Sequence, residues 1–498
     1  MNLLDRAIEY VSPKAGLRRQ RARVQSDILR RGYSATRPSR ANGGWVRAGT
    51  SADAEIGAAA DKLRAIQRDL NRNNPTAAKA VTAWVNNLVG PGIVPRANTG
   101  DAEQDKIVND LWDEFSKVAD ADAGSDVYGL QALAAREMVE GGDALIRRRP
   151  RKARDGLPVA MQLEVLTADY FDSSVTQSPA GREVMQGIEL DALNRRVAYW
   201  LYNKHPGDAY RIGRNDLKSR AVAAQEVTHL YWREAKQLRG VPWGVSAMEH
   251  LRDLADYEHA ELLRKKLEAC AVGVVSDLEE GTGANGEPIV GTSAIVDGTG
   301  QMVDRFEPGM FVHARGGRSV TFNQPHAVGG YYEYKRAMLR TIAAGYRLPY
   351  EILSGDLENV NYSSIRAGFL EFRRLVESLQ WQVLIPLMCE PMWRWFCDVA
   401  YLEGRINSPN VPVIWTPPRF ESIDPLKDVT ADVMEVRAGL TSMTDAIAKR
   451  GYNADDVLAS IKSWNDKIDA AEIILDTDPR RVTHTGAMQA ALTLATKD

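Results

Sequence analysis

Side chains able to perform covalent or metal chemistry are sparse in this sequence and are not arranged for it. The chain has seven histidines and three cysteines, and no histidine stands at a metal-ligand spacing from a cysteine. No Gly-Lys dipeptide occurs, so the Gly-Lys-Ser/Thr loop with which many ATPases bind phosphate is missing. No Ser-His-Asp or Cys-His order suggests a nucleophile with its base. The sequence therefore predicts no catalytic residue, no cofactor and no metal.

The histidines and cysteines are expected to be structural. His205 lies in the turn sequence HPGD, and His229 lies in the strand-like sequence VTHLYW. A histidine with satisfied hydrogen bonds is the expected state when no second ligand is suitably spaced. The cysteines, Cys270, Cys389 and Cys397, are few and odd in number, which argues against a disulfide framework and favours a reducing cytoplasm.

Charge is distributed unevenly along the chain. Residues 1–48 hold eleven Lys or Arg and three acids, a net 11 − 3 = +8, so the remaining residues sum to −3 − 8 = −11. The segment LRRQRAR over 17–23 concentrates this charge in Arg18, Arg19, Arg21 and Arg23. We expect 1–50 to be a basic arm whose arginines contact DNA or an acidic neighbouring subunit, the alternative being a solvated tail.

Length and hydropathy narrow the class of protein further. A chain of 498 residues with 44% hydrophobic and 26% charged residues is expected to fold into two to four domains of about 100–200 residues each. The start, MNLLDRAIEY, lacks the basic region and long apolar core of a signal peptide. No apolar run reaches the ~18 residues that a membrane span needs, so no membrane contact is expected.

Periodicity and turn signals predict an α+β chain that is mostly helical. Helical spacing is predicted over 55–88, where Pro75 should divide the pattern into two helices, and over 103–140, 245–270, 331–346, 364–404 and 425–475. Pro386 and Pro391 should kink the helix over 364–404. Strands are expected within 143–231, 272–326 and 405–425. The basic run RRRPRKAR over 147–154 is expected at an exposed edge or turn of a hairpin.

The middle of the chain carries the clearest architectural signal. A long helix over 245–270, a small strand-rich insertion and a return helix predict an antiparallel helix pair with a small domain at its tip. A helix of ~26 residues spans ~39 Å, which exceeds an ordinary globular helix. The alternative is that both are core helices of a large α+β protein.

Two charged segments belong to this region. The loop over 348–363 contains Glu351, Asp356 and Glu358 and no Lys or Arg. The first long helix mixes both signs, with acids at Glu249, Asp253, Asp256, Glu258, Glu261 and Glu268 and bases at Arg252, Arg264, Lys265 and Lys266. Such a mixed face is equally compatible with a solvated surface.

The order of motifs resembles the lambda-type family of phage portal proteins over nearly the whole chain. The clearest similarity is LRTIAAGYRLPYEILSGDLENVNYSSIRAGFLEFRR over 339–374, where NYSSIR follows an xLPYEILS loop. The other similar segments are RDLNRNNPTAAKAVTAWVNNLVGPGIVPRA (68–97), GGDALIRRR (141–149), LEVLTADYFD (163–172), GIELDALNRRVAYWLYNKHPGD (187–208), VTHLYWREAKQLRGVPWGVSAMEHLRDLADYEHAEL (227–262), IDPLKD (423–428) and AGLTSMTDAIAKRGYNADDV (438–457). EAKQL stands where the family has a Gly-containing turn, and 279–320 matches poorly.

The resemblance implies the portal fold and its function. The implied parts are a basic N-terminal arm (1–50), a wing of helices then sheet (51–244), a first stem helix (245–270), a clip (271–327), a second stem helix (328–347), a tunnel loop (348–363), a long wing helix with a return strand (364–425) and a helical crown (426–498). The family forms a dodecameric ring at one vertex of the phage head. Implied partners are double-stranded DNA, terminase, scaffold, major capsid and head-completion proteins. The implied location is the virion, after assembly in the bacterial cytoplasm.

The same resemblance implies where DNA would pass. Glu351, Asp356, Glu358, Asn361, Tyr362 and Ser363 would belong to the tunnel loop, with Ser363 or Ser364 capping the next helix. Glu249, Asp253, Asp256, Arg264 and Lys265 would belong to the stem wall of the channel. A sliding channel should be acidic or of mixed charge, because each added Lys or Arg contact strengthens binding to phosphate. The alternatives are a terminase-like packaging enzyme and another head–tail adaptor ring.

Overall fold

The computed structural model describes residues 49–208, 218–269, 273–276, 311–314, 319–322, 330–358, 362–418, 420, 425–450, 452, 454–473, 475, 478 and 480. The chain divides into two compact units, Met1–Glu55 and Ile56–Asp498. Of the first unit the structure describes only 49–55, so Arg18, Arg19, Arg21 and Arg23 lie outside the described residues. The second unit contains the sheets and nearly all of the helices.

The first helices follow their capping residues. Helix α3 (Ala52–Asn73) and helix α4 (Pro75–Leu88) are separated at Asn74, whose side chain accepts hydrogen bonds from the backbone N–H groups of Thr76 and Ala77. Pro75 occupies the first position of α4, where its missing N–H costs nothing. The predicted division at Pro75 is therefore confirmed. Helices α5 (Ala102–Ser116) and α6 (Val127–Gly141) likewise begin after capping aspartates.

The described strands form four small sheets. One has the order β3-β2-β8, from β2 (Asp143–Pro150), β3 (Met161–Thr167) and β8 (Val227–Tyr231). The second has the order β4-β5-β6-β7, from β4 (Val184–Met185), β5 (Ile188–Leu190), β6 (Arg196–Tyr202) and β7 (Ser219–Ala223). The third pairs β1 (Val94–Ala97) with β12 (Val413–Thr416), antiparallel. The fourth lies between two long helices in the sequence and is described with them below.

The basic run over 147–154 was expected at an exposed edge or turn of a hairpin. This is wrong for Arg147, which has a strand on both sides, but β8 does not pair with β2 beyond Arg147, so residues 148–150 lie at an edge. Strand β2 is the central strand of its sheet, with β3 on one side and β8 on the other. Arg148 is only partly exposed and donates two hydrogen bonds to the Glu226 carboxylate, at 2.9 and 2.5 Å. Arginine is accommodated there because a carboxylate faces it. The second half is an exposed turn, Ala153–Asp155.

The long segment predicted over 364–404 is a single helical run with a changed pitch. Helix α10 (Tyr362–Leu379) continues into a π-helical stretch, η7 (Gln380–Cys389), and then into α11 (Glu390–Leu402). Pro386 lies inside η7, where the wider turn accommodates a residue that cannot donate a backbone hydrogen bond. The sequence predicted kinks at Pro386 and Pro391; the structure has a π-helical segment at Pro386, whereas Pro391 lies in the first turn of α11.

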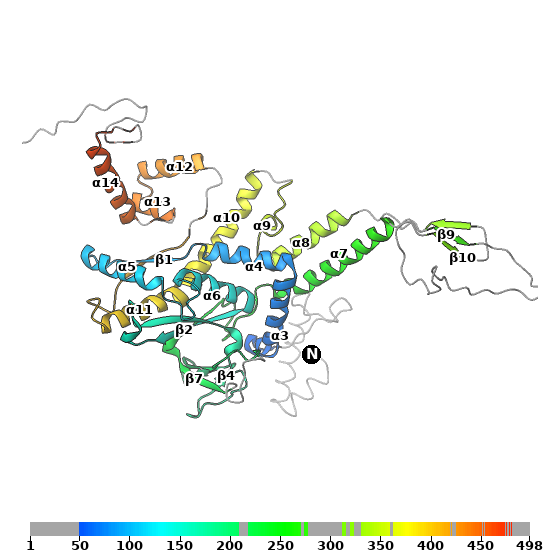
Figure 1. Ribbon diagram of the computed structural model, residues 1–498, viewed down its shortest axis with the longest axis horizontal. Helices are drawn as coiled ribbons and strands as arrows, with labels where there is room; N and C mark the ends of the chain where they lie inside the picture. The colour runs from blue at the N-terminus through cyan, green and yellow to red at the C-terminus, as the bar shows by residue number, and fades with distance from the viewer. Residues whose placement is uncertain are drawn as a thin grey trace, which may run out of the picture. The chain divides into compact units, whose positions relative to one another are not determined.

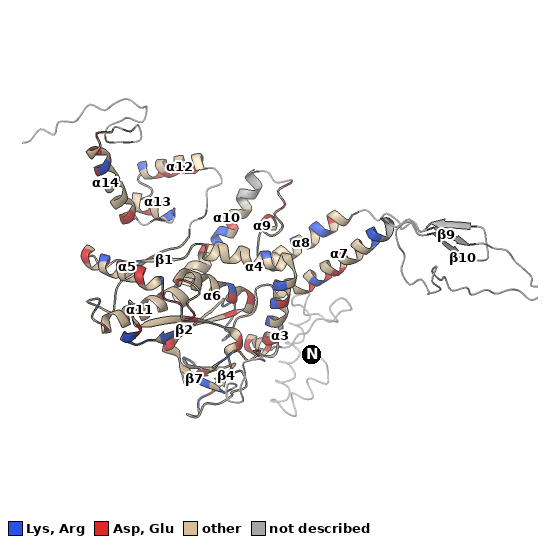
Figure 2. Ribbon diagram, in the orientation of Figure 1, with Lys and Arg blue, Asp and Glu red and all other residues tan. Residues whose placement is uncertain are grey.

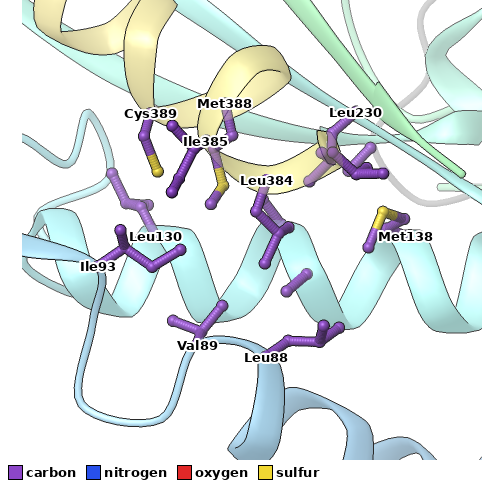
Figure 3. Close-up of a cluster of buried hydrophobic side chains, with 14 of the residues drawn as sticks. Leu88, Val89, Ile93, Leu130, Met138, Leu230, Leu384, Ile385, Met388 and Cys389 are labelled. Atoms are coloured by element: carbon purple, nitrogen blue, oxygen red, sulfur yellow. The ribbon is translucent and has the colours of Figure 1, made fainter. Parts of the chain in front are cut away.

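The main hydrophobic core forms around this π-helical stretch. Figure 3 shows Leu384, Ile385, Met388 and Cys389 of η7 facing Leu88, Val89 and Ile93, Leu130 and Met138 of α6, and Leu230 of β8. All ten side chains are almost completely buried. Cys389 and Cys397 are free and buried, as expected for a chain without disulfides, and burial raises the pKa of Cys397 to about 12. Cys270 lies outside the described residues.

Two helices pack antiparallel and are joined through a small strand-rich segment. They are α7 (Met248–Ala269) and α8 (Tyr331–Gly345), which lie side by side in Figure 1. Between them in the sequence lie β9 (Gly273–Ser276), β10 (Phe311–Ala314) and β11 (Ser319–Phe322), in the order β10-β9-β11. The structure thus contains the predicted helix, strand-rich insertion and return helix.

The C-terminal part is helical, as predicted. It contains α12 (Pro425–Arg437), α13 (Met443–Lys449) and α14 (Ala454–Ala470). Arg450 pairs with Asp432 at 2.5 Å, which links the end of α13 to α12. Many large apolar side chains of this part stay exposed in the single chain, among them Leu426, Val433, Met434, Leu458, Ile461 and Trp464.

Gly244, which precedes α7, is expected to be intolerant of substitution. A Cβ atom there would overlap both Gln67 Oε1 and the Tyr346 ring, which are tightly packed. We expect Gly244→Ala to lower the free energy of unfolding by about 1–3 kcal/mol, measured by denaturant titration. The matched control is Gly368→Ala in α10, where a Cβ would meet nothing within 4 Å. The free energy of unfolding of the control should rise by up to about 1 kcal/mol. An equal decrease in both variants would contradict the packing argument.

Candidate functional site

The base of the α7–α8 pair is fixed to the hydrophobic core. Ser246 Oγ donates a hydrogen bond to the Gly345 carbonyl, at 3.1 Å, where the two helices meet. Leu251 and Leu254 of α7 and Ile342 of α8 are buried in the main core. The buried face of α7 therefore runs through Met248, Leu251 and Leu254. Ala255 and Leu262 continue the helical spacing of Met248 and Leu251, but both are exposed.

Tyr346, directly after α8, is the anchor of this base. Its side chain is completely buried, its hydroxyl accepts a hydrogen bond from Gln67 Nε2 at 2.8 Å, and its carbonyl accepts one from Trp84 Nε1 at 2.8 Å. Burial raises the pKa of Tyr346 to about 12. The next residue, Arg347, turns the chain with φ of 58° and stacks its guanidinium on Trp232.

Farther along, the two helices are joined by aromatic and charged contacts. The Tyr257 ring of α7 lies 4.5 Å from the Tyr334 ring and 6.0 Å from the Tyr331 ring of α8, measured between centroids. Lys335 Nζ pairs with Glu258 Oε1 at 2.6 Å. Glu258 interrupts the apolar pattern of α7 because it faces a lysine of the partner helix.

Helix α7 carries both signs of charge along its length, as Figure 2 shows. Of the five residues predicted for this surface, Glu249, Asp253, Asp256 and Lys265 are exposed. Arg264 is partly buried and pairs with Glu261 at 2.6 Å, so its charge is offset within the helix. Arg252 and Asp256 lie 4.0 Å apart along the same helix. The surface is therefore mixed, without an excess of basic charge.

The segment after Tyr346 was predicted to be a loop, but part of it is helical. Residues Tyr350–Ser354 form the short helix α9, which ends at Gly355 with φ of 72°. Of the residues predicted for the tunnel loop, Glu351 lies in α9, while Asn361 lies outside the described residues. Helix α10 begins at Tyr362, so Ser363 and Ser364 stand inside its first turn and the predicted serine cap is wrong. Serine is tolerated there because the first N–H groups of a helix have no helical acceptor.

The two remaining acids of this segment are anchored to α8. Asp356 Oδ2 accepts a hydrogen bond from the Tyr350 hydroxyl at 2.8 Å and lies 3.8 Å from Arg336 Nε. Glu358 Oε2 accepts one from the Tyr332 hydroxyl at 2.8 Å. The pKa of Asp356 is lowered, first by the hydrogen bond from the Glu358 backbone N–H and next by the one from Tyr350. No sequence pattern signalled these contacts, because Tyr332 and Glu358 are separated by 26 residues.

A second charged cluster lies in the sheet region and is buried. Asp143 Oδ2 accepts a hydrogen bond from Arg239 Nε at 2.5 Å, and its Oδ1 lies 3.1 Å from His229 Nε2. The other ring nitrogen, Nδ1, lies 3.1 Å from Arg196 Nη1. A neutral ring with its proton on Nε2 satisfies both contacts. His229 is 3% exposed, so this His–Asp pair stabilises the sheet, as the sequence predicted for His229.

The described part of the chain has neither a metal cluster nor a membrane-spanning helix. No three His, Cys, Asp or Glu side chains gather there in a way that could hold a metal ion. No described helix is long and apolar enough to cross a membrane.

Comparison with known proteins assigns the chain to a family. A family model described as phage portal protein, lambda family, matches residues 38–380. Since this is more than half of the 498 residues, the chain belongs to the lambda family of phage portal proteins.

Individual relatives carry the same description. The chain is 24% identical over 454 residues to the probable portal protein of Halomonas phage phiHAP-1, covering 87% of this chain and 86% of the relative. It is 30% identical over 144 residues to the portal protein of Escherichia phage N15 and to portal protein B of Escherichia phage lambda, covering 26% of this chain and 27% of each. A solved chain from the neck of an empty gene transfer agent particle has 13% identity and a TM-score of 0.44, covering 78% of this chain and 93% of that chain.

His229 predicts a pH dependence of stability. Burial is the main cause that lowers its pKa, from 6.5 to about 4. In the unfolded chain the His229 imidazole takes up a proton below pH 6.5, whereas in the folded chain it does so only near pH 4. The free energy of unfolding should therefore fall as the pH falls from about 6.5 to about 4. The decrease in the free energy of unfolding should reach up to about 3 kcal/mol.

The matched variant is His229→Gln, whose amide does not titrate and can still donate to Asp143. Urea unfolding near pH 7.5 and near pH 4.5 should show a smaller acid loss for the variant. Other titrating groups, such as Glu137, whose pKa burial raises to about 7, cancel in this difference. Identical losses in both proteins would contradict the assignment.

Proposed function

We propose that the chain is the subunit of a closed ring through which double-stranded DNA enters and leaves a phage head. The observation that carries the proposal is the antiparallel α7–α8 pair in a chain of the portal family. Repeated around an axis, such pairs would form the wall of a channel. The family is one of structural proteins, which agrees with a role without catalysis.

The parts of the chain can be assigned on this proposal. Residues 1–50 would be the basic arm, 51–244 the wing, 245–270 and 328–347 the stem helices, and 271–327 the clip. Residues 348–363 would be the tunnel loop, 364–425 the long wing helix with β12, and 426–498 the crown. The ring, a dodecamer by this proposal, would sit at one vertex of the virion after assembly in the host cytoplasm. There it would contact scaffold, major capsid protein, terminase and head-completion proteins.

A ring of identical subunits needs two different surfaces on each copy that fit one another. The single chain leaves apolar side chains exposed on two separate helices, Leu426 and Val433 on α12 and Leu458 and Trp464 on α14. Large exposed apolar patches are typical of protein–protein contact sites. These helices are therefore suited to contact neighbouring copies.

The mixed charge of α7 suits a surface past which DNA slides. Phosphate contacts are independent of base sequence, and each Lys or Arg that neutralises a phosphate strengthens binding. Glu249, Asp253 and Asp256 are exposed on this helix and repel phosphate, so a wall built from α7 would hold DNA weakly. The segment over 350–358 would narrow the channel mainly by its bulk, since two of its acids are anchored to α8.

The ring and the role of the loop can be tested together. Negative-stain images of the purified full chain should show rings with a central hole. Deleting 354–360 should leave ring formation intact and lower DNA packaging or retention in assembled heads. Monomers in the images would contradict the ring, and normal packaging by the deletion would contradict the role of the loop. ATP turnover by the purified chain would instead favour a packaging enzyme.

The basic arm makes a separate prediction. Replacing Arg18, Arg19, Arg21 and Arg23 with alanine removes four of the eleven positive charges in 1–48. If the arm contacts DNA or an acidic neighbour, assembly of the variant should be weaker and less sensitive to salt, because screening acts on exposed charges. Sedimentation of assemblies across a salt series measures this. Assembly that is insensitive to salt and unchanged by the substitutions would exclude an electrostatic role.

A further inference from the structure

The face of α8 turned toward the 350–358 segment is basic. Arg336 and Arg340 stand four residues apart and therefore share one face of the helix with Tyr332. The Arg336 guanidinium lies 5.9 Å from the ring centroids of both Tyr332 and Tyr350, and that of Arg340 lies 5.5 Å from the Tyr350 ring. These aromatic rings hold the two arginines side by side.

The acids of the segment lie against this basic face. Asp356 is 3.8 Å from Arg336, and the nearby charge of Arg340 also lowers the pKa of Asp356. Glu358 is held by the Tyr332 hydroxyl at 2.8 Å. We call this arrangement the loop clasp: Asp356 and Glu358 of the segment against Tyr332, Arg336 and Arg340 of α8.

The loop clasp leaves the hydrogen-bonding capacity of the arginines partly unused. The 3.8 Å between Arg336 Nε and Asp356 Oδ2 is too long for a hydrogen bond. Arg336 Nε is buried and has no hydrogen-bond partner among the described residues. A guanidinium prefers planar, two-point contact with an oxyanion, which this geometry does not supply.

A third cation lies close to the loop clasp. The Lys79 ammonium of α4 lies beside Gly355, 3.0 Å from where a Cβ would stand. A phosphate diester would supply negative charge and acceptor oxygens to these cations.

We propose that Arg336 and Arg340 form a binding site for the phosphates of the DNA backbone, and that the loop clasp covers it. The inference rests on the proposed function, which brings DNA to this helix pair. While Asp356 and Glu358 are in place, they stand in for phosphate and DNA passes with little retention. When the segment is displaced, both arginines become available and grip the backbone. The segment then controls retention of DNA through charge as well as through bulk.

The test removes the covering charges and leaves the shape nearly unchanged. Asp356→Asn with Glu358→Gln keeps an acceptor oxygen at both positions. Binding of a short fluorescent DNA duplex to purified full-length rings is measured by anisotropy over a salt series. The variant should bind more tightly, and its slope of log affinity against log salt should steepen by about 0.9 for each additional phosphate that an arginine neutralises.

A matched variant separates this effect from net charge. Glu333→Gln with Glu377→Gln removes two acids from α8 and α10 but none from the loop clasp, and should bind DNA like the unaltered chain. Adding Arg336→Gln and Arg340→Gln to the first variant should abolish its increase in affinity. An equal increase in the matched variant, or an increase that survives loss of both arginines, would overturn the proposal.

The remaining outcomes distinguish this proposal from the proposed function. Unchanged binding by Asp356→Asn with Glu358→Gln, in rings that form normally, overturns the phosphate site and leaves the ring intact. Failure of the unaltered chain to form rings overturns the proposed function instead. If the double variant does not assemble, Tyr332→Phe frees Glu358 without changing charge and should also raise DNA affinity. No change with Tyr332→Phe would then count against the loop clasp.

Discussion

Burial of the Tyr346 side chain is the constraint on which the functional region depends. The residue ends α8, fills the core beside Trp84, and has both its hydroxyl and its carbonyl hydrogen-bonded there. A buried aromatic of this size contributes about 2–3 kcal/mol from its apolar surface alone, and the paired hydroxyl avoids the cost of an unsatisfied polar group. The base of the α7–α8 pair is thereby held at one place. The α9 segment, which follows Tyr346 in the chain, is positioned from this base.

The charged residues of the protein fall into two groups, one buried and one exposed, and the two groups have different roles. In the sheet region Asp143, His229 and Arg239 are almost completely buried, and each has partners that make its burial tolerable. On α7 and around α9 most of the charges are exposed or half-exposed, where an ion pair contributes little to stability. Charges of this second kind can exchange partners at small cost. On the proposed function, the contacts near Asp356 would suit a moving polyanion, and those near Asp143 would not.

Much of the local structure could be predicted because its causes are local. The division of α3 from α4 follows from Asn74 and Pro75, and the irregular turn in η7 follows from Pro386. The long helix, the strand-rich insertion and the return helix followed from periodicity and turn residues. Family membership followed from the order of the motifs, which a family model over 38–380 confirms.

Contacts between distant residues could not be predicted from the sequence. The acids of 348–363 were expected to belong to the tunnel loop, and no sequence pattern indicated that Asp356 and Glu358 lie against Arg336 and Tyr332. The central position of β2 is likewise a matter of which strands pair with it.

The amino-acid sequence by itself therefore determined the elements, their order and the family, because helix caps, prolines and hydrophobic spacing act over a few residues. Only the tertiary structure decided which charges are left for a ligand. Packing of α8 against the α9 segment brings together side chains that no sequence pattern relates. A charge already matched by an internal partner binds other groups differently from the same charge exposed to water.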